Sequence, residues 1–247
     1  MTGINVVIPV AEKDLKVLPL CMDSIKNFID KDAKFHIVAK DSVLDSIDAD
    51  VNTLRESYFE FSVGDIKNAI KHKGQAGWYW QQIMQFYLWD VLPELSSSIL
   101  FVNSDVVFLK PIPIIDRGLY VLNYHNNQHD PYSVFTKRLF PDIELNFWNG
   151  TCHYMPYDKN IVLELRNDVE RRFNMPFWKA FCNCIDDSHI NGASEFYLYF
   201  QYCLNKHPKK IETKKLSFAD KGDYWNWKEY QNQGFDYAAF HAYMRGE

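Results

Sequence analysis

The chain has 247 residues, of which 47% are hydrophobic and 16% aromatic, and this composition excludes a disordered chain. The length allows a sizeable core, and we expect a single domain over residues 1–247. The formal net charge of −5 at pH 7 argues against a nucleic-acid-binding protein, because a general nucleic-acid surface needs a basic footprint.

The sequence indicates a soluble, cytoplasmic protein. The apolar run at 4–10 is too short for a signal peptide and has no basic residue before it. Since no stretch approaches 18 consecutive apolar residues, we expect no transmembrane segment. The five cysteines are odd in number and irregularly spaced, which favours reduced thiols over a disulfide framework.

Strands and helices alternate along the first half of the chain. Residues 4–10 form a continuous apolar run typical of a strand buried on both faces, and residues 18–29 have helical spacing. Residues 34–40 predict a second strand, and the alternating residues 58–65 predict a third. Residues 77–92 are apolar on most helical faces, which predicts one long and deeply packed helix.

The next predicted strand, 98–108, is interrupted by the polar triplet 103–105. Unpaired polar groups inside a buried strand cost about 1–3 kcal/mol each, so the triplet requires binding partners. Further on, residues 118–124 predict a strand and residues 194–205 a helix.

The order of these elements predicts an α/β fold with a largely parallel central sheet flanked by helices.

Several common nucleotide and hydrolase motifs are missing from the sequence. It contains no GxGxxG, GxxxxGK[ST], GxSxG or HExxH pattern. A bound phosphate would therefore have to be held by groups other than a glycine-rich loop. Asp105 suits a hard divalent cation such as Mg²⁺ or Mn²⁺, which takes one or two carboxylates from the protein and further oxygens from phosphates and water.

Five segments, in order along the chain, are similar to one family of enzymes. SILFVNSDVVFLKPI (98–112) resembles the DxD-bearing strand of GT-A-type glycosyltransferases. The other four resemble segments of a family of small soluble polysaccharide-type glycosyltransferases of bacteria and large DNA viruses. They are NVVIPVAEKDLKVLPLCMDSI (5–25), GWYWQQIMQFY (77–87), NGTCHYMPYDKNIVLEL (149–165) and SEFYLYFQYCLNKHP (194–208).

The resemblance implies a metal-dependent glycosyltransferase with a GT-A-like fold. In such a fold we expect a nucleotide-sugar-binding half at about 1–110, and a mixed acceptor half with the C-terminal tail at about 111–247. Such an enzyme moves a sugar from a nucleotide diphosphate-sugar, with a UDP-sugar favoured, to a hydroxyl of a glycan or similar acceptor. The resemblance gives Asp105 and His241 as ligands of Mn²⁺ or Mg²⁺. Asn103 departs from the family pattern, which has Asp at this position, and an amide keeps an acceptor oxygen but loses a charge. Glu195 is the predicted catalytic base, with Asp186 and Asp187 in reserve.

Other polar and aromatic residues are candidate substrate contacts. The predicted donor-binding residues are Asn103, Ser104, Asp105, Lys73, Trp78 and Gln82. The predicted acceptor-binding residues are Trp148, Asn149 and His153. Structural alternatives remain open for them: core packing for the aromatic residues, a solvated loop for Lys73, and a strand bulge capped by Asn103 and Asp105.

Two other functions remain open at this stage. The protein could be a non-catalytic nucleotide- or sugar-binding module, because Asn103 lacks the negative charge that the family pattern has at this position. A sugar nucleotidyltransferase fits less well, because residues 9–19, after the first strand, contain neither the glycine nor the arginine expected there.

Overall fold

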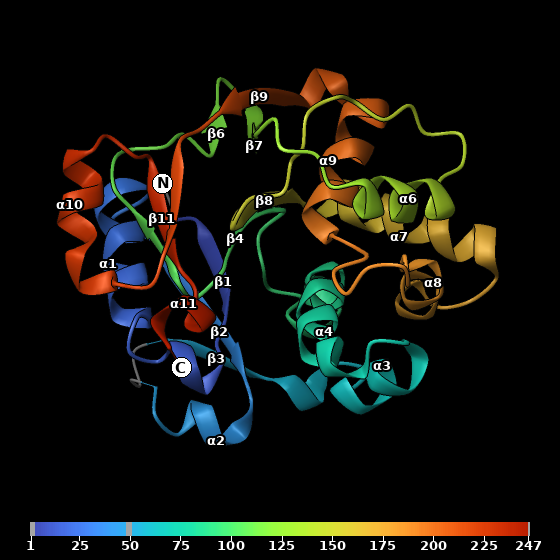
Figure 1. The fold of residues 1–247 in the computed structure, drawn as a ribbon, viewed down its shortest axis with the longest axis horizontal. Helices are drawn as coiled ribbons and strands as arrows, with labels where there is room; N and C mark the ends of the chain where they lie inside the picture. The colour runs from blue at the N-terminus through green and yellow to red at the C-terminus, as the bar shows by residue number, and fades with distance from the viewer. Residues whose placement is uncertain (1–2, 48–50, 247) are drawn as a thin grey trace.

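The computed structural model describes residues 3–47 and 51–246 and has an α/β architecture (Figure 1). The main sheet has the strand order β3-β2-β1-β4-β8. Its strands are β1 (Asn5–Pro9), β2 (Lys34–Ala39), β3 (Asn52–Arg55), β4 (Ser98–Val102) and β8 (Tyr154–Asp158). The first four run parallel, and β8 pairs antiparallel with β4. The predicted α/β class is confirmed, and the main sheet is mixed.

Two three-stranded sheets accompany the main one, with the orders β10-β11-β5 and β6-β7-β9. Their strands are β5 (Val106–Phe108), β6 (Ile115–Asp116), β7 (Leu119–Tyr124), β9 (Ile211–Lys215), β10 (Phe218–Lys221) and β11 (Tyr237–Phe240). Each small sheet contains one parallel and one antiparallel pairing.

The helices lie on both faces of the main sheet (Figure 1). They are α1 (Leu18–Phe28), α2 (Asp41–Leu44), α3 (Val63–Ala69), α4 (Ala76–Met84), α5 (Leu88–Val91), α6 (Asp130–Leu139), α7 (Lys159–Phe173), α8 (Phe177–Cys184), α9 (Glu195–Lys206), α10 (Trp227–Asn232) and α11 (Ala242–Arg245).

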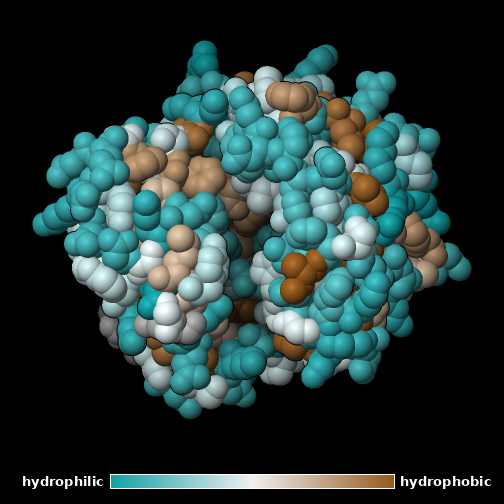
Figure 2. Space-filling view, in the orientation of Figure 1, coloured by the Kyte–Doolittle hydropathy of each residue, from teal (hydrophilic) through white to brown (hydrophobic). Residues whose placement is uncertain are grey.

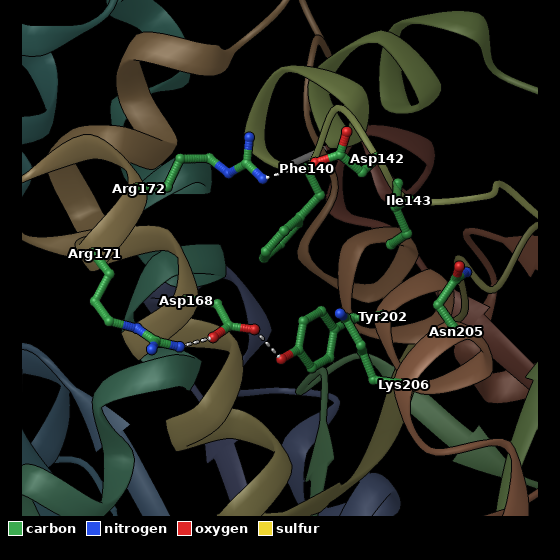
Figure 3. A pocket seen from close by; sticks show the side chains of 9 residues that line it. All are labelled: Phe140, Asp142, Ile143, Asp168, Arg171, Arg172, Tyr202, Asn205 and Lys206. Atoms are coloured by element: carbon green, nitrogen blue, oxygen red, sulfur yellow. Dashed lines mark hydrogen bonds and ion pairs between the residues drawn. The ribbon is translucent and has the colours of Figure 1, made fainter.

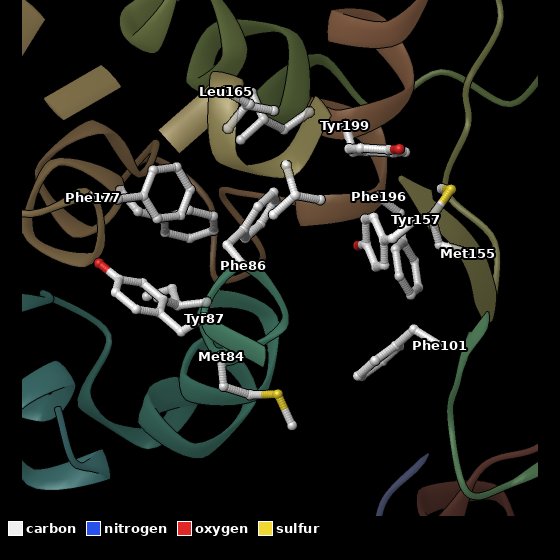
Figure 4. Packing of buried hydrophobic residues seen from close by; sticks show 14 of the residues in the cluster. Met84, Phe86, Tyr87, Phe101, Met155, Tyr157, Leu165, Phe177, Phe196 and Tyr199 are labelled. Carbon is white, nitrogen blue, oxygen red and sulfur yellow. The ribbon is translucent and has the colours of Figure 1, made fainter. Parts of the chain in front are cut away.

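The central strands of the main sheet are buried on both faces, as the continuous apolar run of β1 predicted. Val6 and Ile8 pack into a cluster with α1, β5 and β11. Val7, which points to the other face, packs into the larger cluster built by α4, α7, α8 and α9. Phe101 of β4 and Tyr157 of β8 face the same large cluster, together with side chains of α9 (Figure 4). The strand ends are thereby fixed between two rigid layers.

Three predicted elements are wrong in their extent or type. Residues 58–65 are not a strand, because Ser62 and Asp65 form a reciprocal capping box that starts α3. The predicted helix 77–92 is interrupted by a 3-10 turn at Gln85–Tyr87 between α4 and α5. The predicted strand 98–108 is two strands, β4 and β5, that belong to different sheets.

The predicted strands at 4–10, 34–40 and 118–124 are confirmed as β1, β2 and β7, and the helices at 18–29 and 194–205 as α1 and α9. In α9 the Ser194 hydroxyl accepts a hydrogen bond from the Tyr197 backbone N–H, as expected of an N-cap.

Candidate functional site

A cleft of about 700 Å³ opens at the carboxyl ends of the parallel strands. Its lining includes the carboxyl ends of β1, β2 and β4, at Val10, Val38 and Asn103. Helix α4 and the start of α9 line it as well, and so do His241 and the first residues of α11. Figure 2 shows the surface hollowed between the two halves of the molecule. In open α/β sheets this is the usual position of a ligand.

Most of the predicted site residues meet in this cleft, although they come from distant parts of the chain. The predicted residues that line it are Trp78, Gln82, Asn103, Ser104, Asp105, His153, Glu195 and His241. Among the residues that the structure describes, the lining does not include Lys73, Trp148 or Asn149.

The polar triplet forms the turn at which the chain leaves the main sheet. The Asn103 backbone N–H donates to the carbonyl oxygen of His153, and its side-chain oxygen accepts from Gln81 Nε2 at 3.2 Å. The Ser104 hydroxyl donates to Asp14 Oδ2 at 3.1 Å. The backbone carbonyl of Asp105 accepts from the Phe240 N–H, which ties the turn to β11. These partners satisfy the buried polar groups and direct the Asp105 carboxylate toward the cleft wall that carries His241.

His241 lies between two carboxylates at the edge of the cleft. Its Nδ1 is 3.2 Å from Asp105 Oδ2, and its Nε2 is 3.1 Å from Asp220 Oδ1. His153 Nε2 is 3.6 Å from the same Asp220 oxygen. Potential ligand atoms of His153, Asp220 and His241 all lie within 4.8 Å of one another, so nitrogen and oxygen donors converge at one point.

The electrostatics of this group follow from burial and close contacts. Burial disfavours the imidazolium of His241, but the hydrogen bonds to Asp105 and Asp220 outweigh it and raise the pKa of His241 to about 9. Burial opposes the ionised form of both carboxyl groups, but the contacts with His241 lower the pKa values of Asp105 and Asp220. Burial and repulsion from His241 lower the pKa of His153 to about 4, which leaves a neutral ring suited to ligation.

The donor set fits a divalent metal ion. Neutral imidazole nitrogens and carboxylate oxygens are ligands for Mn²⁺ and other first-row ions, and the open side of the cleft leaves room for further ligands. His153 already has a neutral ring, whereas His241, with its pKa of about 9, would release a proton when it binds the ion. The predicted metal ligands Asp105 and His241 are therefore adjacent, and Asp220 and His153 add two donors to them.

Glu195 lies in the cleft at the start of α9 and is 6% exposed. Gln85 Nε2 donates to Glu195 Oε1 at 2.7 Å, and the Glu195 N–H donates to Gln82 Oε1 at 3.2 Å. Tyr157 donates in turn to Gln85 Oε1, which fixes the orientation of that amide. Burial raises the pKa of Glu195 to about 7, although the Gln85 hydrogen bond partly offsets the effect. A carboxyl group with this pKa exchanges a proton readily near neutral pH.

Other predicted contacts are engaged elsewhere. Lys73 Nζ donates to the backbone carbonyl of Asn68, at the end of α3. The Trp148 ring stacks on Tyr124, with ring centroids 4.6 Å apart. The buried Asn149 amide holds its own loop, since it donates to the Asn127 carbonyl and accepts from the Thr151 N–H. These contacts match the structural alternatives given for Trp148 and Lys73, and they show that Asn149 has a structural role in its loop.

Among the described residues, the lining of the cleft includes neither of the reserve residues, Asp186 and Asp187. Asp186 accepts from the Ser188 N–H at 3.2 Å and lies 3.6 Å from the Arg138 guanidinium. His72 lies 3.1 Å from the backbone carbonyl oxygen of Asp187.

Several residues of the site were missed by the sequence analysis. Lys13, Asp14 and Lys40 line the cleft because they follow β1 and β2, whose ends meet there. Their position in the sequence could have identified them, since polar residues that follow parallel strands gather at one edge of a sheet. Gln81 lines the cleft from α4. Asp220 contacts His241 but is not among the lining residues, and it comes from β10, a strand that no sequence pattern had predicted.

A second cavity, of about 530 Å³, is lined by residues of α7, α9 and the segment after α6 (Figure 3). Arg171 pairs with Asp168, which also accepts from the Tyr202 hydroxyl at 2.7 Å. Arg172 Nη2 lies 3.2 Å from Asp142 Oδ2. Each guanidinium thus has a carboxylate partner, and these charges compensate one another.

No protein-family model and no curated protein matches this chain. Within the described residues, no helix is both long and apolar enough to cross a membrane.

Proposed function

We propose that this protein is a metal-dependent glycosyltransferase with a GT-A-like fold. The observation that carries the proposal is that Asp105, His241 and Glu195, which come from three separate segments, line one cleft at the carboxyl ends of the parallel strands. The order β3-β2-β1 supports a nucleotide-binding half, because it is the strand order of one half of the dinucleotide-binding folds, and β4 adjoins β1 as the fourth strand does in those folds.

The donor in this proposal is a nucleotide diphosphate-sugar, with a UDP-sugar favoured. Its diphosphate lies against the corner formed by Asp105 and His241, where a bound Mn²⁺ or Mg²⁺ ion would neutralise the charge of the leaving diphosphate. Lys13 and Lys40 line the same cleft and add positive charge near the strand ends. The exposed face of Trp78 offers a stacking surface for a sugar or base.

The acceptor is a hydroxyl group of a glycan or a similar molecule. In an inverting transfer, Glu195 takes the proton of that hydroxyl while its oxygen bonds to the anomeric carbon of the donor. The bond from that carbon to the diphosphate breaks, and its electron pair leaves with the nucleoside diphosphate. Gln82 and Gln85 hold Glu195 in position for this step.

A screen of nucleotide diphosphates and their sugars, with and without Mn²⁺, tests the donor part of the proposal. A ligand at 100 times its Kd should add about 2.7 kcal/mol of stability. This corresponds to a rise in melting temperature of roughly 5–10 °C for a chain of this size. The rise should be lost in Asp105→Ala and kept in the control Asp142→Ala, whose carboxylate is exposed and lies outside the cleft.

Release of nucleoside diphosphate from the ligand found in the screen tests catalysis. Glu195→Gln should keep donor binding and lose turnover, because only proton removal is impaired. Binding without any turnover by the unmodified protein would favour the non-catalytic binding module. A screen in which no nucleotide diphosphate stabilises the protein would overturn the proposal.

A further inference from the structure

The proposed metal corner contains more donor atoms than a single carboxylate and histidine. Asp220, on β10, and His153, just before β8, approach His241 from two other segments of the chain. The pair distances are 3.1 Å from His241 Nε2 to Asp220 Oδ1 and 3.6 Å from His153 Nε2 to the same oxygen.

These separations are close to those of atoms that share one metal ion. Ligands bound at about 2.0–2.2 Å, with angles between the octahedral and tetrahedral values, lie roughly 2.8–3.6 Å apart. Both pairs that include Asp220 fall within this range, and the three ligand atoms all lie within 4.8 Å of one another. A small inward rotation of the two imidazole rings would complete a three-ligand site.

The second nitrogen of each ring already has a partner. His241 Nδ1 faces Asp105 Oδ2 at 3.2 Å, and His153 Nδ1 faces the buried Tyr237 hydroxyl at 3.3 Å. Histidines that bind metal through Nε2 commonly donate the Nδ1–H to a carboxylate or another oxygen, which fixes the tautomer. Asp105 is placed as such a partner, because its carboxylate meets the nitrogen that points away from Asp220.

We infer that the metal ion is held by His241 Nε2, Asp220 and His153 Nε2, and that Asp105 orients the His241 ring through its contact with Nδ1. The inference rests on the proposed function, whose metal site it redefines, and it concerns only residues of this chain. Two imidazoles and one carboxylate favour Mn²⁺, Co²⁺ or Zn²⁺ over Mg²⁺, which prefers oxygen ligands. Three protein ligands leave positions open for diphosphate oxygens.

The same arrangement explains why Asn can occupy position 103. The Asn103 side-chain oxygen accepts from Gln81, so this amide is directed at α4. Asp220 supplies the second carboxylate of the corner from a different strand. Asp220 thus provides the negative charge that Asn103 lacks.

Metal titration of the full chain without nucleotide tests the inference. Calorimetry with Zn²⁺, Mn²⁺, Co²⁺ and Mg²⁺ measures affinity, and Co²⁺ absorption reports the ligand set. Asp220→Asn and His153→Gln should each weaken Co²⁺ and Mn²⁺ binding by 100-fold or more. Asp105→Asn should weaken it by about 10–100-fold, as loss of an orienting partner does, and should keep the Co²⁺ spectrum.

Two exposed residues outside the cluster serve as controls: Asp142→Asn and His189→Gln should bind metal like the unmodified chain. Melting curves in EDTA identify any variant that fails to fold. If His153→Gln, whose side chain is 18% exposed, fails to fold, the more exposed Asp220→Asn decides whether the inference holds.

Unchanged metal affinity in Asp220→Asn with loss of binding in Asp105→Asn would overturn the inference, as would equal affinity for Mg²⁺ and Mn²⁺. The metal-site inference and the proposed function can be rejected independently of each other. Metal binding as described, without binding of any nucleotide diphosphate-sugar, would reject the function alone. Mn²⁺-dependent transfer that is unaffected by Asp220→Asn would reject the inference alone.

Discussion

Replacing Glu195 by Gln should stabilise the protein in a pH-dependent way. Glu195 is buried, and its pKa is raised from 4.5 to about 7. Since the folded state holds this proton more tightly than the unfolded state, stability falls as pH rises from about 4.5 to about 7. The shift corresponds to about 3 kcal/mol of lost stability above pH 8. Gln has the same shape, can accept the hydrogen bond from Gln85 and has no charge to desolvate.

Urea unfolding of both proteins between pH 4 and pH 8.5 measures this effect. The free energies of unfolding should be similar near pH 4, and the variant should become about 3 kcal/mol more stable above pH 8. The corresponding difference in melting temperature is roughly 6–12 °C. The control Glu144→Gln replaces an exposed carboxylate and should show no such trend. A stability difference that does not change with pH would refute the reasoning that Glu195 is a buried, weakly compensated carboxyl group.

Three further outcomes follow from the same structure. The rate of sugar transfer should rise with pH and level off above about 7, as Glu195 loses its proton; a rate that falls through this range would contradict its role as base. Gln85→Leu removes a hydrogen bond that lowers the pKa of Glu195, so the midpoint of that pH profile should move upward. Gly150→Ala should destabilise the fold by about 1–3 kcal/mol in urea unfolding, because the new Cβ would lie 2.1 Å from Phe200 Cγ. Gly74→Ala, with no atom within 4 Å of its Cβ, is the matched control.

The first strands and helices could be predicted because their sequence periodicity reflects burial directly. The continuous apolar run of β1 corresponds to a strand with Val6 and Val7 on opposite buried faces. The wrong strand at 58–65 shows the limit of this reasoning. Phe59 and Phe61 alternate with polar residues, but the capping box of Ser62 and Asp65 determines the local structure by satisfying the first amides of α3.

The grouping of Asp105, His241 and Glu195 was expected from a resemblance between motifs, and the structure brings these residues to one cleft. Asp220 could not be placed from the sequence. Its position depends on β10 pairing with β11, and β11 pairing with β5, which are long-range contacts without a local signal. For the same reason, the division of 98–108 between two sheets could not be predicted.

The decisive measurement is a crystal structure of the full chain with Mn²⁺ and a UDP-sugar, with anomalous diffraction recorded at the manganese edge. We expect the nucleotide in the cleft between α4 and the strand ends. The manganese peak should lie about 2.0–2.3 Å from His241 Nε2 and from an oxygen of the diphosphate. A nucleotide bound elsewhere on the protein, or a manganese peak in contact with the diphosphate but remote from His241, would contradict the proposed function and its metal site.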